Sequence, residues 1–147
     1  MPSDEPTLAA PRMAPPPGLE AISSQSPWDR AAHRRGRAYP DLVAGFRGEY
    51  DGAPDLVARP RTAAEVAQVL ESCHHHRLAV VPFGGGTSVV GGVDSGLAGA
   101  GHAGVVSLDL SHLSGLLELD AVSRVARLGA GTLGPALEAA LAPHGLT

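Results

Sequence analysis

Cysteine and aromatic residues are scarce in this sequence. Of its 147 residues one is cysteine, Cys73, and only 3% are aromatic. A lone cysteine excludes an internal disulfide framework and fits a reducing compartment. Much of the apolar content is alanine, so the core has few bulky side chains, and we expect the chain on its own to be marginally stable.

Long apolar runs and a strong excess of charge are also absent. No run reaches the roughly 18 apolar residues of a membrane-spanning helix. The N-terminal MPSDEPTLAAPR has neither the basic nor the apolar region of a signal peptide. The net charge of −4 is spread along the chain, which argues against a nucleic-acid partner. We therefore expect a cytoplasmic protein with no transmembrane segment.

Proline is unevenly distributed and divides the chain. Residues 1–25 contain six prolines among small and polar residues, a composition typical of disorder. We predict a disordered leader over residues 1–25, a helical lead-in over 26–50 and the main domain over 51–147. The last residues, GPALEAALAPHGLT, leave a helical pattern where another strand would begin. We therefore expect a fragment whose domain is incomplete at the C-terminus.

The helical lead-in starts with SPWDRAAHRRG. Ser26 can cap a helix, Pro27 suits its first position and Gly36 can end it. The arginines here could bind phosphate, but a basic run is more often a solvated helix face. We predict a solvated face for Arg30, Arg34, Arg35 and Arg37.

The main domain begins with a strand, a helix and a second strand. The pattern predicts strands at 56–58 and 78–81, joined by a helix that Thr62 and Glu65 cap. The apolar face of that helix consists of Val66, Val69, Leu70 and Cys73.

The rest of the main domain changes pattern. A strand at 105–110 precedes a hairpin of LLELD and RVARLGAG, and a final helix carries Leu133, Leu137 and Leu141 on one stripe. The order of elements predicts an α+β fold, with a small mixed sheet and flanking helices.

A glycine-rich loop follows the strand at 78–81, within the stretch AVVPFGGGTSVVGG. Glycines let backbone N–H groups approach an anionic ligand, and Thr87 and Ser88 add hydroxyl donors. The loop lacks the ending of a Walker A motif, and Val89 stands where GxGxxG needs its third glycine. The pattern alone leaves open a ligand-binding loop and a flexible turn.

Two other stretches match GxGxxG. Gly99, Gly101 and Gly104 follow no strand, which is the wrong context for a dinucleotide site. Gly129, Gly131 and Gly134 do lie between a strand and a helix, as in a Rossmann phosphate loop. Against that alternative, two arginines, Arg124 and Arg127, interrupt a strand that a doubly wound sheet would bury.

Metal-binding and catalytic patterns are weak. In CHHHR only Cys73 and His76 could share a metal, and two ligands do not make a site, so no metal site is expected. Asp109 and Asp120 stand at strand ends, where aspartate favours turns. We assign no catalytic residue within this chain.

From about Asp41 to Thr147, the chain resembles the N-terminal half of the FAD-binding domain of FAD-linked oxidases, the vanillyl-alcohol oxidase or PCMH-type flavoproteins. The stretches GGGTS and SLDLSHL are most similar to the branch with alkyldihydroxyacetonephosphate synthases and glycolate oxidase or D-lactate dehydrogenase subunits. The resemblance implies a PCMH-type fold, of which this chain holds the N-terminal part.

The resemblance implies that the glycine loop wraps the FAD pyrophosphate, with Pro82 ending the strand pairing. The cofactor-binding residues would be Pro82, Phe83, Gly84, Gly85, Gly86, Thr87 and Ser88. Some relatives attach FAD through a histidine in this loop; residues 83–92 contain none, so noncovalent FAD is expected. The catalytic residues would lie after Thr147. The GAGTLG turn would be a structural corner.

The activity implied is that of an FAD-dependent oxidoreductase. It would oxidise a small organic substrate, such as a 2-hydroxy acid or an alcohol, by hydride transfer to flavin, and the fragment alone would be inactive. Three alternatives stay open: a synthase-like flavoenzyme without net redox change, a noncatalytic truncated or interaction module, and a Rossmann NAD(P)-binding domain. A homodimer or a partner subunit is compatible with all of them.

Overall fold

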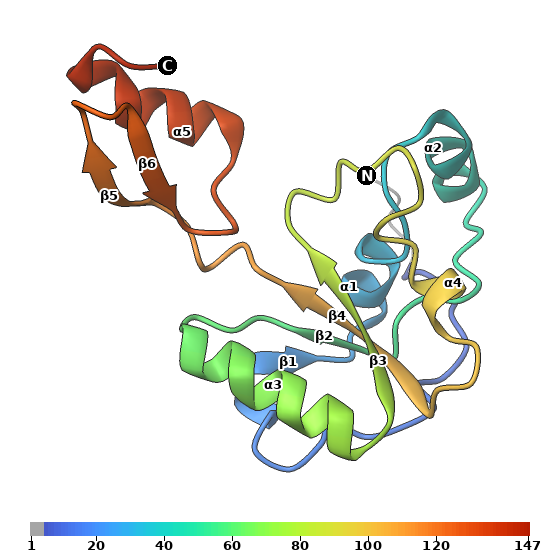
Figure 1. Ribbon diagram of the computed structural model, residues 1–147. Coiled ribbons are helices and arrows are strands. Elements are labelled where there is room, and N and C mark those ends of the chain that lie inside the picture. Colours follow the sequence, from blue (N-terminus) through green and yellow to red (C-terminus); the bar gives the residue numbers. More distant parts are fainter. Residues whose placement is uncertain (1–4) are drawn as a thin grey trace.

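The computed structural model describes residues 5–147 and contains two sheets (Figure 1). The larger sheet has the strand order β1-β2-β4-β3. Strands β2, β4 and β3 are parallel, and β1 pairs with β2 in the antiparallel sense. The smaller sheet is an antiparallel hairpin of β5 and β6. The predicted α+β class is confirmed. The strands are β1 (Ser23–Ser24), β2 (Leu56–Ala58), β3 (Leu78–Phe83), β4 (Gly104–Asp109), β5 (Leu116–Asp120) and β6 (Val125–Leu128).

Helices cover both faces of the larger sheet (Figure 1). On one face, side chains of α3 pack with alternate residues of β2 and β4, such as Leu56 and Val106. On the other, Val105 packs with Val81 and with residues at and before α4. Between residues 5 and 147, no helix is long and apolar enough to cross a membrane. The helices are α1 (Pro27–Ala32), α2 (Tyr39–Phe46), α3 (Ala63–His75), α4 (Ser95–Ala98) and α5 (Gly134–Leu141), with short 3-10 turns at Glu20–Ile22 and Ala142–His144.

Helix α3 begins as the sequence predicts. The Thr62 hydroxyl accepts a hydrogen bond from the Glu65 N–H at 3.1 Å, and the Glu65 carboxylate accepts one from the Arg61 N–H at 2.6 Å. Val69 and Cys73 are buried, but Leu70 is 45% exposed, so its predicted place on the apolar face is wrong. One turn separates Val69 from Cys73, whereas Leu70 lies about 100° further round the helix.

The final helix also begins later than its apolar stripe suggests. Leu133 is the residue that precedes α5, and it is 57% exposed, whereas Leu141 is buried. The hairpin β5-β6 and α5 form a unit that extends away from the larger sheet (Figure 1).

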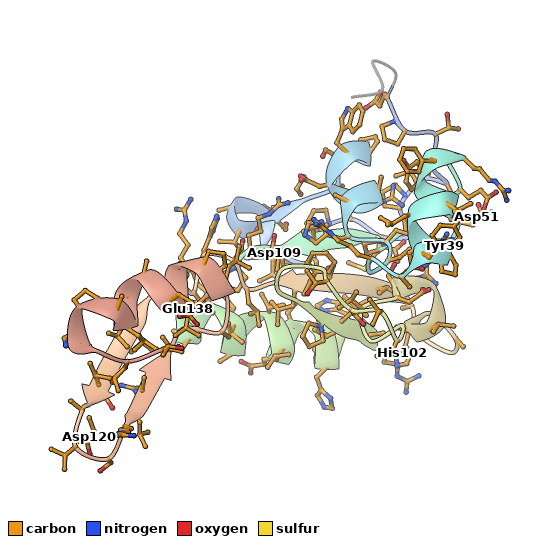
Figure 2. The ribbon with its side chains drawn as sticks, turned by 90° about the horizontal axis from the view of Figure 1, so that it is seen from above. Tyr39, Asp51, His102, Asp109, Asp120 and Glu138 are labelled. Carbon is orange, nitrogen blue, oxygen red and sulfur yellow. The ribbon has the colours of Figure 1, made fainter. Side chains whose placement is uncertain are left out.

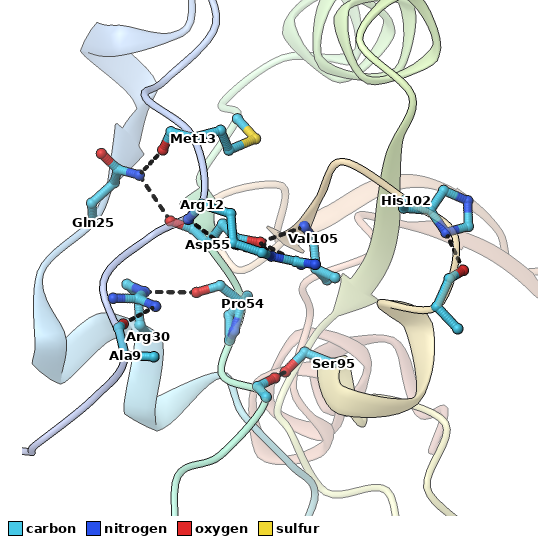
Figure 3. A network of polar contacts seen from close by, with 12 residues as sticks. Ala9, Arg12, Met13, Gln25, Arg30, Pro54, Asp55, Ser95, His102 and Val105 are labelled. Carbon is cyan, nitrogen blue, oxygen red and sulfur yellow. Dashed lines mark hydrogen bonds and ion pairs between the residues drawn. The ribbon is translucent and has the colours of Figure 1, made fainter.

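The described part of the predicted leader packs on the domain. Leu19 is fully buried in the core beneath α3. The backbone N–H and guanidinium of Arg12 donate hydrogen bonds to the Asp55 carboxylate, which also accepts one from the Val105 N–H at 2.7 Å (Figure 3). The boundaries 1–25, 26–50 and 51–147 remain a prediction.

The predicted solvated arginine face is wrong at two positions. Arg30 and Arg34 are only 4% and 8% exposed. Arg30 donates to the carbonyls of Pro54 and Ala9 at 2.7 and 2.9 Å (Figure 3). Arg34 donates to the Asp51 carbonyl and pairs with the Asp94 carboxylate. Arginine carries five N–H donors, so one side chain can satisfy several loop oxygens that helices and strands leave free.

Candidate functional site

The glycine loop leaves the larger sheet at the carboxyl end of β3. The neighbouring parallel strands β2 and β4 end at the same edge, and this edge is where open α/β sheets bind ligands. Gly84, Gly85 and Thr87 are exposed, as are the apolar side chains of Val89 and Val90. The loop therefore presents both backbone and side chains to a ligand.

Pro82 does not end the strand pairing. It lies inside β3, opposite Leu108, and the pairing continues to Phe83 and Asp109. The Phe83 carbonyl accepts a hydrogen bond from the Leu110 N–H at 2.9 Å, so Phe83 faces β4 with its hydrogen-bonding groups and Pro82 faces away. Because β3 is an edge strand, a proline with no N–H costs no ladder bond there.

The loop keeps its hydrogen-bond donors free. Across residues 5–147, no acceptor pairs with the backbone N–H groups of Gly84 to Ser88 or with the Thr87 hydroxyl. The Ser88 hydroxyl accepts a hydrogen bond from the Gly92 N–H at 3.1 Å, which leaves its own proton available. A run of free N–H groups is what a phosphate-binding loop requires.

Gly84 and Gly86 have different surroundings. A Cβ on Gly84 would meet no atom within 4 Å, so only a glycine leaves this part of the loop open to a ligand. Gly86 has φ +65°, and a Cβ there would lie 2.5 Å from Cζ of Phe83. Gly84 thus faces open space, whereas Gly86 allows the loop to pack against the Phe83 ring.

The far end of the loop is held by the segment after α1. The Arg37 N–H donates a hydrogen bond to the Ser88 carbonyl at 2.8 Å. A Cβ on Gly36 would collide with that same carbonyl, so Gly36 is required for the approach. The sequence predicted Gly36 only as a helix end, and α1 in fact ends at Ala32. No local pattern could have indicated its contact with Ser88.

A buried polar cluster lies below the loop, at the end of β4. His33 Nε2 lies 3.1 Å from Asp109 Oδ2, and Arg59 Nε donates to the same oxygen at 3.0 Å. Arg59 Nη2 also donates to Asp29 Oδ1 at 2.8 Å. Figure 2 shows Asp109 in the interior, at the opposite end of β4 from His102. Sequence reasoning missed this cluster, because its members lie far apart in the chain; His33 and Asp109 are separated by 76 residues.

The two carboxylates of this cluster are stabilised in the ionised form. Burial acts to raise the pKa of Asp109, but hydrogen bonds from Ser111, His33 and Arg59 outweigh it and hold the pKa below its ordinary value. The hydrogen bond from Arg59 is the largest cause that lowers the pKa of Asp29. Asp109 therefore accepts hydrogen bonds and is no general acid.

In the rival motif of Gly129, Gly131 and Gly134, the first two glycines have no free N–H group. The N–H groups of Gly129 and Gly131 donate to the carbonyls of Gly115 and Leu113, both at 2.9 Å. A Cβ on either glycine would collide with a backbone carbonyl of residues 110–113. The strand before them is half of an antiparallel hairpin, which is not the Rossmann context. GAGTLG is a structural corner.

The CHHHR stretch forms no metal centre in the part of the chain that the structure describes, where no three potential ligands converge. Cys73 is 1% exposed and packs in the core. Burial raises the pKa of its thiol to about 11. The thiol is therefore protonated and unreactive at neutral pH.

Comparison with known proteins gives one family. The model of a family described as FAD binding domain matches residues 54–147. Alkyldihydroxyacetonephosphate synthase of Trypanosoma brucei brucei is 34% identical over 79% of this chain and 19% of its own length. Glycolate oxidase subunit GlcD of Bacillus subtilis is 31% identical over 58% of this chain and 17% of its own.

A solved structure also matches the fold of this chain. An alkyldihydroxyacetonephosphate synthase superposes with a TM-score of 0.77 at 27% identity, over 86% of this chain and 24% of the other. The chain thus spans about a quarter or less of the length of these relatives.

Proposed function

Because this chain belongs to the FAD binding domain family, with FAD as cofactor, we propose that its glycine loop holds the FAD pyrophosphate, without a covalent link. The free N–H groups of Gly84 to Ser88 carry the proposal. Pro82 and Phe83 bring the loop to the carboxyl edge of the sheet, and the hydroxyls of Thr87 and Ser88 supply further donors to phosphate oxygens. The exposed glycines keep side chains out of the way.

The whole enzyme is proposed to be an FAD-dependent oxidoreductase that acts on a small organic substrate, such as a 2-hydroxy acid or an alcohol. Bound FAD would supply the acceptor for a hydride from a substrate C–H bond. The residues of this chain bind and orient phosphate, and hydride transfer requires catalytic residues outside it. The glycolate oxidase subunit GlcD among the relatives supports this activity.

A second candidate is a synthase that uses FAD without net redox change. One observation favours it: the alkyldihydroxyacetonephosphate synthase matches 79% of this chain, against 58% for the glycolate oxidase subunit. Both candidates require the glycine loop to bind the FAD pyrophosphate. They differ in whether a substrate reduces the flavin.

The visible absorption spectrum of the purified protein, in the full length that its gene encodes, tests FAD binding. Gly84→Asp places a carboxylate where the pyrophosphate would lie, and we expect FAD affinity to fall about tenfold or more. Gly45→Asp is the control, because Gly45 also has open space around a Cβ and lies on α2. A folded Gly84→Asp variant that holds FAD as the parent does would overturn the proposal.

The reaction is tested by anaerobic addition of 2-hydroxy acids and alcohols to the flavin-loaded protein. Loss of the oxidised-flavin absorbance is expected for the oxidoreductase. Persistent absorbance with every such substrate would contradict it and favour the synthase.

A further inference from the structure

His33 has no role in either proposed reaction, the oxidoreductase or the synthase. His33 follows the last residue of α1, and its side chain is 6% exposed. Nδ1 lies 2.7 Å from the Asp29 carbonyl oxygen, and Nε2 lies 3.1 Å from Asp109 Oδ2. The imidazole is therefore fixed at both nitrogens.

Both of these partners can only accept a hydrogen bond. A backbone carbonyl has no proton to donate, and neither has an ionised carboxylate. Asp109 is held in the ionised form by donors on both oxygens, Arg59 Nε on Oδ2 and the Ser111 N–H on Oδ1. The imidazole thus bridges the end of α1 and the end of β4.

The partners of His33 are themselves held in place. Arg59, which follows β2, pairs with Asp29 of α1 and with Asp109 of β4. The His33 ring therefore lies between two elements that Arg59 ties together.

Contacts connect His33 to the glycine loop. The His33 ring lies 4.3 Å from the Phe83 ring, inclined at 45°. Phe83 is the register partner of Asp109 on the neighbouring strand, so the ring and the carboxylate project from adjacent positions. Gly86 packs against the tip of the Phe83 ring, so closely that a Cβ on Gly86 would lie 2.5 Å from Cζ. Movement of the Phe83 ring would displace Gly86.

We propose that His33 is a positioning residue for the glycine loop, because its imidazole, held at both nitrogens, fixes the Phe83 ring against which Gly86 packs. Its effect on FAD rests on the proposed function, while its effect on Gly86 does not. Without its contacts to Asp29 and Asp109, the ring is free to move against Phe83. The loop N–H groups then lose their fixed spacing.

Nuclear magnetic resonance of the full-length protein, labelled with ¹⁵N in glycine, tests the inference without reference to FAD. We expect His33→Phe to shift the Gly86 amide resonance, whereas the His102→Phe control should leave that resonance where it is in the parent. An unaltered Gly86 resonance in folded His33→Phe would overturn the inference.

His33→Phe provides a second test, since it keeps an aromatic ring against Phe83 and removes both ring nitrogens. We expect FAD to bind about tenfold more weakly. The control is His102→Phe, at the other end of β4 (Figure 2), which should leave the affinity unchanged. Unaltered affinity in folded His33→Phe would contradict the inference. If the parent takes up no FAD, the proposed function fails, whereas the Gly86 amide resonance still decides the role of His33.

Discussion

At the scale of single residues, the fold depends on Gly86 and not on Gly84. Gly86 has φ +65° and rests on Phe83, whereas Gly84 has open space around a Cβ. We expect Gly86→Ala to lower the free energy of unfolding by about 1–3 kcal/mol, from backbone strain and the clash with the ring. Gly84→Ala should change it by less than about 0.5 kcal/mol. Urea denaturation measures both, and equal losses would contradict this distinction.

Asp109 makes the stability of the fold depend on pH in the acid range. Its pKa is lower in the folded chain than its ordinary value of 3.8. The carboxylate therefore stabilises the fold above about pH 4, and this stability is lost as the pH falls through the folded pKa. Urea denaturation between about pH 5 and pH 3 should show a smaller loss of stability for Asp109→Asn than for the parent. The same loss in both proteins would assign the acid sensitivity to other groups, of which Asp29 is the first to examine.

The contrast between the loop and the cluster shows what could be predicted for single residues. Consecutive glycines after a strand are a local signal, so a ligand-binding segment could be predicted here from the residues of the loop alone. His33 and Arg59 belong to the cluster only through their contacts with Asp109, which lies 76 and 50 residues away in the chain. Only the pairing of strands brings such side chains together, and one sequence does not encode that pairing in a readable pattern.

At the scale of elements, the start of α3 depends on one hydroxyl. Thr62 Oγ1 accepts from the Glu65 N–H, one of the donors that a helix end leaves unpaired. We expect Thr62→Ala to destabilise the protein by about 1 kcal/mol, measured by thermal or urea unfolding. Thr62→Ser keeps the acceptor and is the control, with little change expected. An equal loss in the serine variant would indicate packing of the threonine methyl group instead of capping.

The elements that could be predicted are those with their own periodicity or caps. These include α3, β2, β4 and the hairpin of β5 and β6. The sequence pattern did not predict α4 or β1, and α2 lies within the predicted helical lead-in over 26–50 without bounds of its own. Strand β1 has only two residues, and its pairing with β2 comes from tertiary contact. Helix α4 has four residues and depends on Asp94, which accepts from the N–H groups of Gly96 and Leu97.

At the scale of the whole molecule, the glycine loop lies where the two parts of the chain meet. The larger sheet supplies the loop through β3, and Leu133 approaches it from the start of α5, with Cδ2 3.1 Å from where a Cβ on Gly85 would lie. The loop is thus shaped by residues before and after it in the chain.

Whether the N-terminal segment contributes to the core can be tested at Leu19, because the sequence predicts a disordered leader over residues 1–25. Leu19 is fully buried in the core with Leu56, Val69 and Val106. Leu19→Ala leaves a cavity and should lower the free energy of unfolding by about 2–5 kcal/mol. Leu97→Ala is the control: Leu97 is 75% exposed, and a change within about 0.5 kcal/mol is expected. Urea denaturation measures both variants. A Leu19→Ala protein as stable as the Leu97→Ala control would mean that the segment is a leader after all, and that the core of this chain closes without it.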